Sequence, residues 1–132
     1  AKVGKGAKLL IRERIFTEKE QTAKTEFEVT LDGEGSGTDL ISRSVAKDHS
    51  CQSYVSTIIG NAACSGHSEC DAIIAGNGIV DASPRLCAHN SDASLIHEAA
   101  IGKIAGEQIL KLQTLGLTEQ EAESKIIEGF LS

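Results

Sequence analysis

Thiol and imidazole groups gather in the middle of the chain, in the run Cys64-Ser65-Gly66-His67-Ser68-Glu69-Cys70. These are the soft and borderline ligands that zinc and iron bind in proteins. In an extended strand Cys64 and Cys70 would share one face and His67 would point the other way. A local site would therefore need a loop, which Gly66 permits. Since the spacing is not that of a standard zinc finger, we favour structural thiols with a turn histidine. The alternative is a metal site at Cys64, His67 and Cys70.

The cysteines and histidines also recur along the chain at a rough interval, which suggests a ladder between the coils of a solenoid. The two series are Cys51, Cys70 and Cys87, and His49, His67 and His89. If one coil takes about 20 residues and coils lie about 4.8 Å apart, such a ladder could bring ligand atoms to one metal. The favoured alternative is an inward row of small residues in which Cys replaces Ala or Val.

A third candidate is Ile96-His97-Glu98-Ala99, which we expect at the change from strand to helix. Adjacent residues of an extended segment point apart, so His97 and Glu98 would serve two surfaces. No H-x-x-x-H or E-x-x-H partner follows, no local signature pairs a cysteine with a base, and no G-x-x-x-x-G-K phosphate loop is present. No catalytic residue is assigned. The alternative function is a metal-binding or cysteine-dependent enzyme that uses the Cys64, His67 and Cys70 region.

Composition narrows the function classes further. The 132 residues carry 13 Lys and Arg against 19 Asp and Glu, for a net charge of −6. This balance argues against nucleic-acid binding, which needs clustered basic side chains. No apolar run approaches the roughly 20 residues that span a bilayer, and no amino-terminal signal is present. We expect a cytoplasmic protein with reduced thiols and no membrane contact. The chain has no Met, so either the initiator was removed or the chain is a piece of a longer protein.

Most of the chain is patterned as short strands. Thr25–Leu31 alternates between polar and apolar residues, and turn signals follow about every ten residues. Aromatic residues make up only 3% of the sequence, so small aliphatic side chains must fill the interior. These features favour a parallel β-helix (β-solenoid) over a β-sandwich. A third possible function, that of a β-helical carbohydrate-active enzyme, ranks last because the acidic residues are scattered and do not form the cluster of carboxylates that it needs.

A helical hairpin is predicted at the C-terminal end. After Ala93 the period becomes helical, and one apolar stripe runs to the stop at Gly116. Thr118-Glu119-Gln120-Glu121 is a capping box that begins a second helix. We therefore divide the chain into β-helix coils over residues 1–95 and a helical segment over residues 96–132. The apolar stripe consists of Ile101, Ile104, Ala105, Gln108, Ile109, Leu112 and Leu115. The apolar face of the second predicted helix consists of Ala122, Ile126, Ile127 and Phe130.

Several segments together resemble the SufB/SufD family of iron–sulfur cluster assembly proteins. They cover most of the chain after about Thr25, in the family's order: Asp39–Asp48, Ile58–Ala62, Gly66–Ile74, Ser94–Ile104, Leu115–Ala122 and Ile126–Leu131. The resemblance implies a parallel β-helix followed by a helical segment. It also implies a cytoplasmic scaffold subunit that has no catalytic turnover of its own. The only cofactor it would carry is a transient iron–sulfur cluster.

The resemblance further implies partners. Family members pair through the β-helix, as SufB with SufD or like with like. They dock the ABC-type ATPase SufC on the C-terminal helices and receive sulfur from a cysteine desulfurase system. The partner-binding residues on this basis are Ile109, Leu112, Ile126 and Phe130.

The interface candidates also follow from the resemblance. His97 matches a family histidine at the dimer interface, and Glu98 matches a SufB-type glutamate that is Gly in typical SufD sequences. The SufB acceptor cysteine follows a Gly-Asp-Lys-like turn, whose place is taken here by Gly76-Asn77-Gly78-Ile79. Because Ile79 cannot accept sulfur, Cys87 is the remaining candidate. The chain lacks the family's N-terminal region, so it is a C-terminal fragment or a minimal relative.

Overall fold

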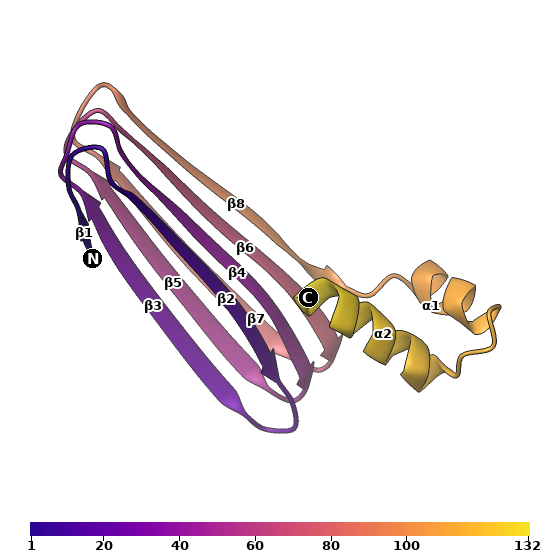
Figure 1. Ribbon diagram of the computed structural model, residues 1–132. Coiled ribbons are helices and arrows are strands. Elements are labelled where there is room, and N and C mark those ends of the chain that lie inside the picture. The colour runs from indigo at the N-terminus through magenta and orange to yellow at the C-terminus, as the bar shows by residue number, and fades with distance from the viewer.

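The computed structural model describes residues 1–132, which form a β-solenoid followed by two helices (Figure 1). All strand pairs are parallel, so the predicted parallel β-helix with two C-terminal helices is confirmed. The odd-strand sheet has the order β1-β3-β5-β7 and the even-strand sheet the order β2-β4-β6-β8. The strands are β1 (Lys2–Val3), β2 (Lys8–Thr17), β3 (Thr22–Leu31), β4 (Ser36–Asp48), β5 (Cys51–Gly60), β6 (Cys64–Gly76), β7 (Ile79–Ala88) and β8 (Ala93–Lys103).

Each coil takes 28 or 29 residues, because Ser36 pairs with Cys64 and Cys64 pairs with Ala93. The expected coil of about 20 residues was therefore wrong. The strands from β2 onward are 10 to 13 residues long, and two segments taken as irregular belong to them. Ser65-Gly66-His67 lies in β6, so His67 is not in a turn, and the residues before Thr25, for which no strand was predicted, contain β2. Backbone pairing with β4 and β8 holds the polar run of β6 in the sheet, and pairing with β4 holds β2.

The interior of the solenoid is built from small side chains, as the composition predicts. At one end of the coils, six buried residues form an apolar cluster: Val3, Val29, Leu31, Leu40, Ile58 and Cys64. Further along the same strands the interior becomes polar, where Ser56 Oγ lies 2.9 Å from Ser68 Oγ. At the other end, Gln52 Nε2 donates to Thr17 Oγ1 at 2.8 Å and to the carbonyl of Val45 at 2.9 Å. These buried polar groups therefore pair with one another, whereas Ser36 Oγ and the Tyr54 hydroxyl are buried without a hydrogen-bond partner.

The turn before β7 requires glycine. A Cβ on Gly78 would lie 2.3 Å from the carbonyl oxygen of Ala46, and Gly76 has φ of +69°. The chain therefore reaches Ile79 through two positions that larger residues cannot occupy without moving backbone.

The two helices are α1 (Gly106–Gln113) and α2 (Glu119–Leu131). The predicted capping box is present: Thr118 Oγ1 accepts from the amide of Glu121 at 3.2 Å, and the Thr118 amide donates to the Glu121 carboxylate at 2.7 Å. The predicted stop at Gly116 has φ of +96°, a left-handed conformation that suits glycine. Figure 1 shows α1 beyond the ends of the strands, while α2 folds back towards the even-strand sheet.

Helix α2 packs against β4, with Ala122 and Ile127 buried and Lys47 Nζ 2.9 Å from Glu123 Oε1. The expected change to helix after Ala93 came too early, because β8 pairs with β6 as far as Lys103. The division of the chain at residues 95 and 96 therefore falls within a strand, and its value as a domain boundary remains an interpretation. Neither helix is long and apolar enough to cross a membrane.

Candidate functional site

Alternation along β6 separates the residues of the first candidate. Cys64 and Cys70 point into the solenoid and are buried, whereas His67 lies on the outer face. The segment is a continuous strand, so the loop that a local site would need is absent. Burial raises the pKa of the Cys70 thiol to about 11, followed by smaller effects of Asp71 and Glu13. Cys70 is therefore held as a neutral thiol, which is neither a good metal ligand nor a good nucleophile.

The longer series of cysteines and histidines do not form ladders either, because the coil is longer than expected. In the register of the sheets, Cys51 lies beside Ile79, Cys70 beside Ala99 and Cys87 beside Ile59. The first and last histidines of the series, His49 and His89, bond to asparagines at the turns instead. His49 Nε2 lies 3.3 Å from Asn77 Nδ2, and His89 Nδ1 lies 2.9 Å from Asn61 Oδ1.

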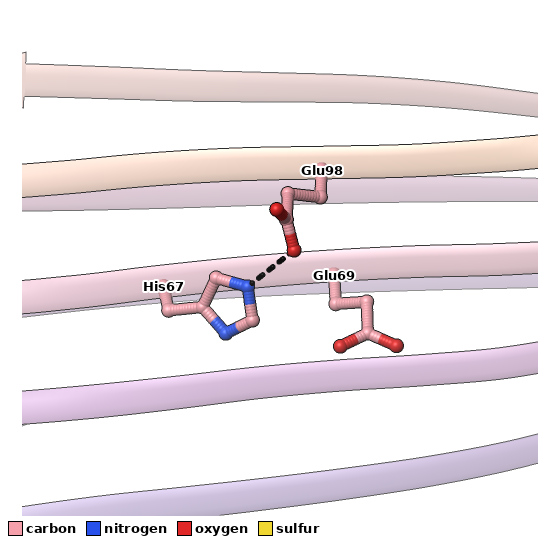
Figure 2. Close-up of side chains that lie close together, drawn as sticks. All are labelled: His67, Glu69 and Glu98. Carbon is pink, nitrogen blue, oxygen red and sulfur yellow. Dashed lines mark hydrogen bonds and ion pairs between the residues drawn. The ribbon is translucent and has the colours of Figure 1, made fainter.

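The outer face of the even-strand sheet brings together residues from three strands around His67. Its Nε2 lies 3.2 Å from Glu98 Oε2 on β8, and its Nδ1 lies 3.4 Å from Asp39 Oδ1 on β4. Glu69 is two residues further along β6 and is the register partner of Glu98. One ligand atom each from His67, Glu69 and Glu98 lies within 4.8 Å of the others. Figure 2 shows the imidazole and the two carboxylates side by side on this face. We call these three residues the His67 cluster.

The charges beside the His67 cluster are of both signs. Burial, followed by the adjacent Asp71 carboxylate, raises the pKa of Glu69, while His67 and Arg43 act in the opposite direction. The basic side chains belong to a cavity of about 260 Å³ next to the cluster, lined by Arg12, Glu13, Arg14, Ile41, Arg43 and Glu69. The acidic side of the face is therefore the side nearer to β8.

The interface candidates point in different directions. His97 is the register partner of Ser68 and points into the solenoid, whereas Glu98 points out towards His67. The Nδ1 atom of His97 is buried and has no hydrogen-bond partner. Cys87 pairs with Ile59 on the outer face of the odd-strand sheet and is exposed. The three residues do not converge within one copy of the chain.

The last coil leaves one end of the solenoid uncovered, and we call the free edges of β7 and β8 the open end. Strand β7 pairs only with β5 and β8 only with β6, so each presents one unpaired edge (Figure 1). Four large apolar side chains on these two strands are exposed: Ile79 (59%), Leu86 (37%), Ile96 (53%) and Ile101 (43%). An unpaired edge with apolar side chains is a template for another strand or another protein.

The helical candidates are less accessible than expected. Ile109, Leu112, Ile126 and Phe130 are all partly buried. The exposed apolar side chains of this region are instead Leu110 (63%) and Leu115 (73%). Leu110 was not predicted as a partner-binding residue, because it does not belong to the predicted apolar stripe. Asp39 and Glu69 were not predicted as site residues either, since they join His67 only when the coil length is known.

Comparison with known proteins identifies relatives over nearly the whole chain. Residues 2–130 match the family model described as SUF system FeS cluster assembly, SufBD core domain. A protein of Methanothermobacter thermautotrophicus named as an iron–sulfur cluster assembly SufBD family protein is 33% identical over 131 residues, which are 98% of this chain and 32% of that protein. Its counterpart in Methanocaldococcus jannaschii is 36% identical over 128 residues, 96% of this chain and 40% of that protein.

A third relative of the same description, from Archaeoglobus fulgidus, is 42% identical over 103 residues, which are 76% of this chain and 28% of that protein. The chain thus spans between about a quarter and two fifths of the length of these curated relatives.

Proposed function

The chain belongs to the SufBD core domain family of iron–sulfur cluster assembly, and on that premise we propose that it is a scaffold subunit of the SUF system. In this role it has no turnover of its own. It pairs with a SufB/SufD-type partner or with a second copy of itself, docks a SufC-type ABC ATPase, and acts in the cytoplasm. The observation that carries the proposal is the family match over residues 2–130 in a solenoid whose last coil is uncovered.

Pairing through the open end is supported by what β7 and β8 expose. Their free edges offer unpaired backbone groups, and a second solenoid end could satisfy them without any rearrangement. The buried, unpartnered Nδ1 of His97 points into the interior at this same end. A buried polar atom without a partner costs about 1–3 kcal/mol. A partner that supplies a hydrogen-bonding group or closes a site around His97 would remove that cost.

Docking of the ATPase on the helices is supported by the exposed side chains near their connection. Leu115 lines a groove of about 590 Å³, which also includes Gly116, Leu117, Gln120, Glu121, Ser124, Lys125 and Glu128. An exposed leucine beside polar and charged groups is the composition of a protein-binding surface. The partly buried Ile109, Leu112, Ile126 and Phe130 then support the helices from beneath, and the direct contacts come from Leu110 and Leu115.

Sulfur handling is the part of the proposal in which this chain departs from a SufB pattern. By the resemblance to SufB, the acceptor cysteine would correspond to Ile79, which is 59% exposed at the start of β7. We propose that sulfur from the desulfurase system reaches the assembly through a cysteine of the partner or through Cys87. The nascent cluster is then a transient cargo near His97 rather than a resident cofactor.

The ATPase contact can be tested by co-purification of the chain with a SufC-type ATPase expressed in the same cells. Substituting both Leu110→Asp and Leu115→Asp should abolish co-purification, because two charges would enter an apolar contact. Leu10→Asp is the matched control, since Leu10 is also exposed (52%) but lies on β2. Equal recovery of the ATPase with the double variant and with the control would contradict this contact.

A further inference from the structure

We propose that the His67 cluster binds one divalent first-row metal ion on the outer face of the even-strand sheet. The ligands are the Nε2 atom of His67 and one carboxylate oxygen each from Glu69 and Glu98. Asp39 is a positioning residue that holds the imidazole by its other nitrogen. This site is distinct from His97, which lies on the opposite face of β8.

The strands hold the three ligands in a nearly correct arrangement. His67 and Glu69 project from the same face of β6, and Glu98 projects from β8 in register with Glu69. Their ligand atoms lie within 4.8 Å of one another. Two ligands of one ion, each bound at about 2.1 Å, are at most about 4.2 Å apart. Small rotations of the half-buried Glu69 and the exposed Glu98 side chains are therefore enough to close the site, and the backbone need not move.

The position of Asp39 supports a metal more specifically than the glutamates do. Metal-binding histidines usually direct their second ring nitrogen to a carboxylate, which fixes the tautomer and makes the first nitrogen a stronger ligand. Here Nδ1 lies 3.4 Å from Asp39 Oδ1, while Nε2 lies 3.2 Å from Glu98 Oε2. With the proton on Nδ1, the lone pair of Nε2 would face a carboxylate oxygen. A cation between the two removes this repulsion; in the metal-free chain a proton on Nε2, donated to the Glu98 carboxylate, does the same.

The charge around His67 itself favours a cation. Its ring lies 3.2 Å from Glu98 Oε2 and 3.4 Å from Asp39 Oδ1, and Glu69 follows on β6, whereas the basic side chains of Arg12, Arg14 and Arg43 line the cavity beside Glu69. A bound divalent ion would neutralise part of the negative charge of these carboxylates.

The ligand set indicates which ions fit. One imidazole and two carboxylates suit Fe²⁺, Mn²⁺, Co²⁺ and Zn²⁺, and three positions of an octahedral ion would remain open. The side chain of Glu98 is 67% exposed and that of His67 is 30% exposed, so an ion can enter and leave without unfolding of the sheet. Only the choice of Fe²⁺ as the physiological ion, held for cluster assembly, rests on the proposed function. Binding of a divalent ion follows from the ligands alone.

The proposal is tested by titrating the chelator-treated chain with Mn²⁺ and following free Mn²⁺ by electron paramagnetic resonance, and then by repeating the titration with Fe²⁺ under anaerobic conditions by calorimetry. We expect one ion per chain. His67→Ala and Glu98→Gln should each weaken binding by at least about tenfold, since loss even of outer partners costs 10- to 100-fold. Asp39→Asn should weaken it less.

Two matched controls keep the result interpretable. His89→Ala removes an exposed histidine that bonds to Asn61 at a turn, and Glu26→Gln removes an exposed carboxylate on β3 in the odd-strand sheet. Both should bind Mn²⁺ like the wild type. Glu98→Gln is nearly isosteric and exposed, so it remains informative if His67→Ala folds poorly.

Absence of stoichiometric binding at millimolar Mn²⁺ and Fe²⁺ would overturn the proposal, and so would binding that persists in both His67→Ala and Glu98→Gln. Either result would leave His67 with only its contacts to Glu98 and Asp39. The outcome is separate from that of the scaffold proposal, because ATPase co-purification with the wild-type chain does not involve the His67 cluster.

Discussion

Gly66 is closely packed between neighbouring coils beside His67, and this packing lets us estimate how much a larger residue at this position would destabilise the chain. Gly66 is buried on β6, and a Cβ added there would lie 2.9 Å from both Ile58 Cγ2 and Leu95 Cδ2. Carbon atoms pack best at about 3.5–4.0 Å, so both methyl groups would have to retreat by roughly 0.6 Å. Ile58 is fully buried and cannot move freely, whereas Leu95 is only partly buried at the last coil. Overpacking of this kind costs typically about 1–3 kcal/mol.

We therefore expect Gly66→Ala to destabilise the chain by about 2 kcal/mol, which lowers Tm by roughly 8 °C for a domain of this size. Gly102→Ala is the matched control, because a Cβ on Gly102 of β8 meets nothing within 4 Å. Its Tm should be unchanged or slightly higher. Both values are measured by urea and thermal unfolding followed by circular dichroism.

A double-mutant cycle with Leu95→Ala tests the cause of the loss. If the new Cβ clashes with the Leu95 methyl group, the double variant should lose less free energy of unfolding than the two single variants lose together. The difference should be at least about 0.5 kcal/mol. The reasoning is refuted if Gly66→Ala is as stable as Gly102→Ala, or if the two single effects simply add.

Three further predictions concern a helix cap, a thiol and a carboxylate. Thr118→Ala removes the capping box of α2 and should cost about 1 kcal/mol in urea unfolding; an unchanged midpoint would mean that α2 does not unfold with the rest. In the native chain at pH 8, an alkylating reagent should modify the exposed Cys87 well before the buried Cys70, whose pKa is about 11; mass spectrometry showing equal rates would contradict this burial. Because burial, and then the adjacent Asp71, raises the pKa of Glu69, the contribution of Glu69 to the stability of the metal-free wild type should fall as pH rises through the carboxyl range. Glu69→Gln should therefore be more stable than wild type at pH 7, by a few tenths of a kcal/mol, with no such advantage at pH 3.5; the opposite order in urea unfolding would argue against crowding of the carboxylates.

The fold class could be predicted from the sequence because the turn residues and the small aliphatic side chains are local signals. The coil length could not, because long strands contain polar and glycine residues that locally resemble turns, such as Ser65-Gly66-His67 in β6. A signal for the true length was present in the turn residues Asp32, Asn61 and Asn90. They recur at the coil spacing, and Asn61 Nδ2 donates to Asp32 Oδ1 at 2.7 Å.

Because the coil length was wrong, the sequence could not predict which side chains of neighbouring coils meet at the candidate site. The alternation rule correctly predicted that Cys64 and Cys70 oppose His67 and that His97 and Glu98 point apart. It could not show that His67 and Glu98 meet, since they are 31 residues apart and join only through the register of β6 and β8. Side chains on neighbouring coils become a site only when the register is known.

Anaerobic reconstitution tests the central claim most directly, namely that cluster assembly takes place on this chain at the open end. The chain, co-purified with its SufB/SufD-type partner or as a pair of copies together with the ATPase, is supplied with Fe²⁺ and sulfide and followed by visible absorption. We expect iron–sulfide charge-transfer bands for the wild type. His97→Ala should lose most of this absorption while the assembly stays intact in size-exclusion chromatography. A wild-type assembly that remains colourless, or a His97→Ala assembly with undiminished bands, would contradict the account.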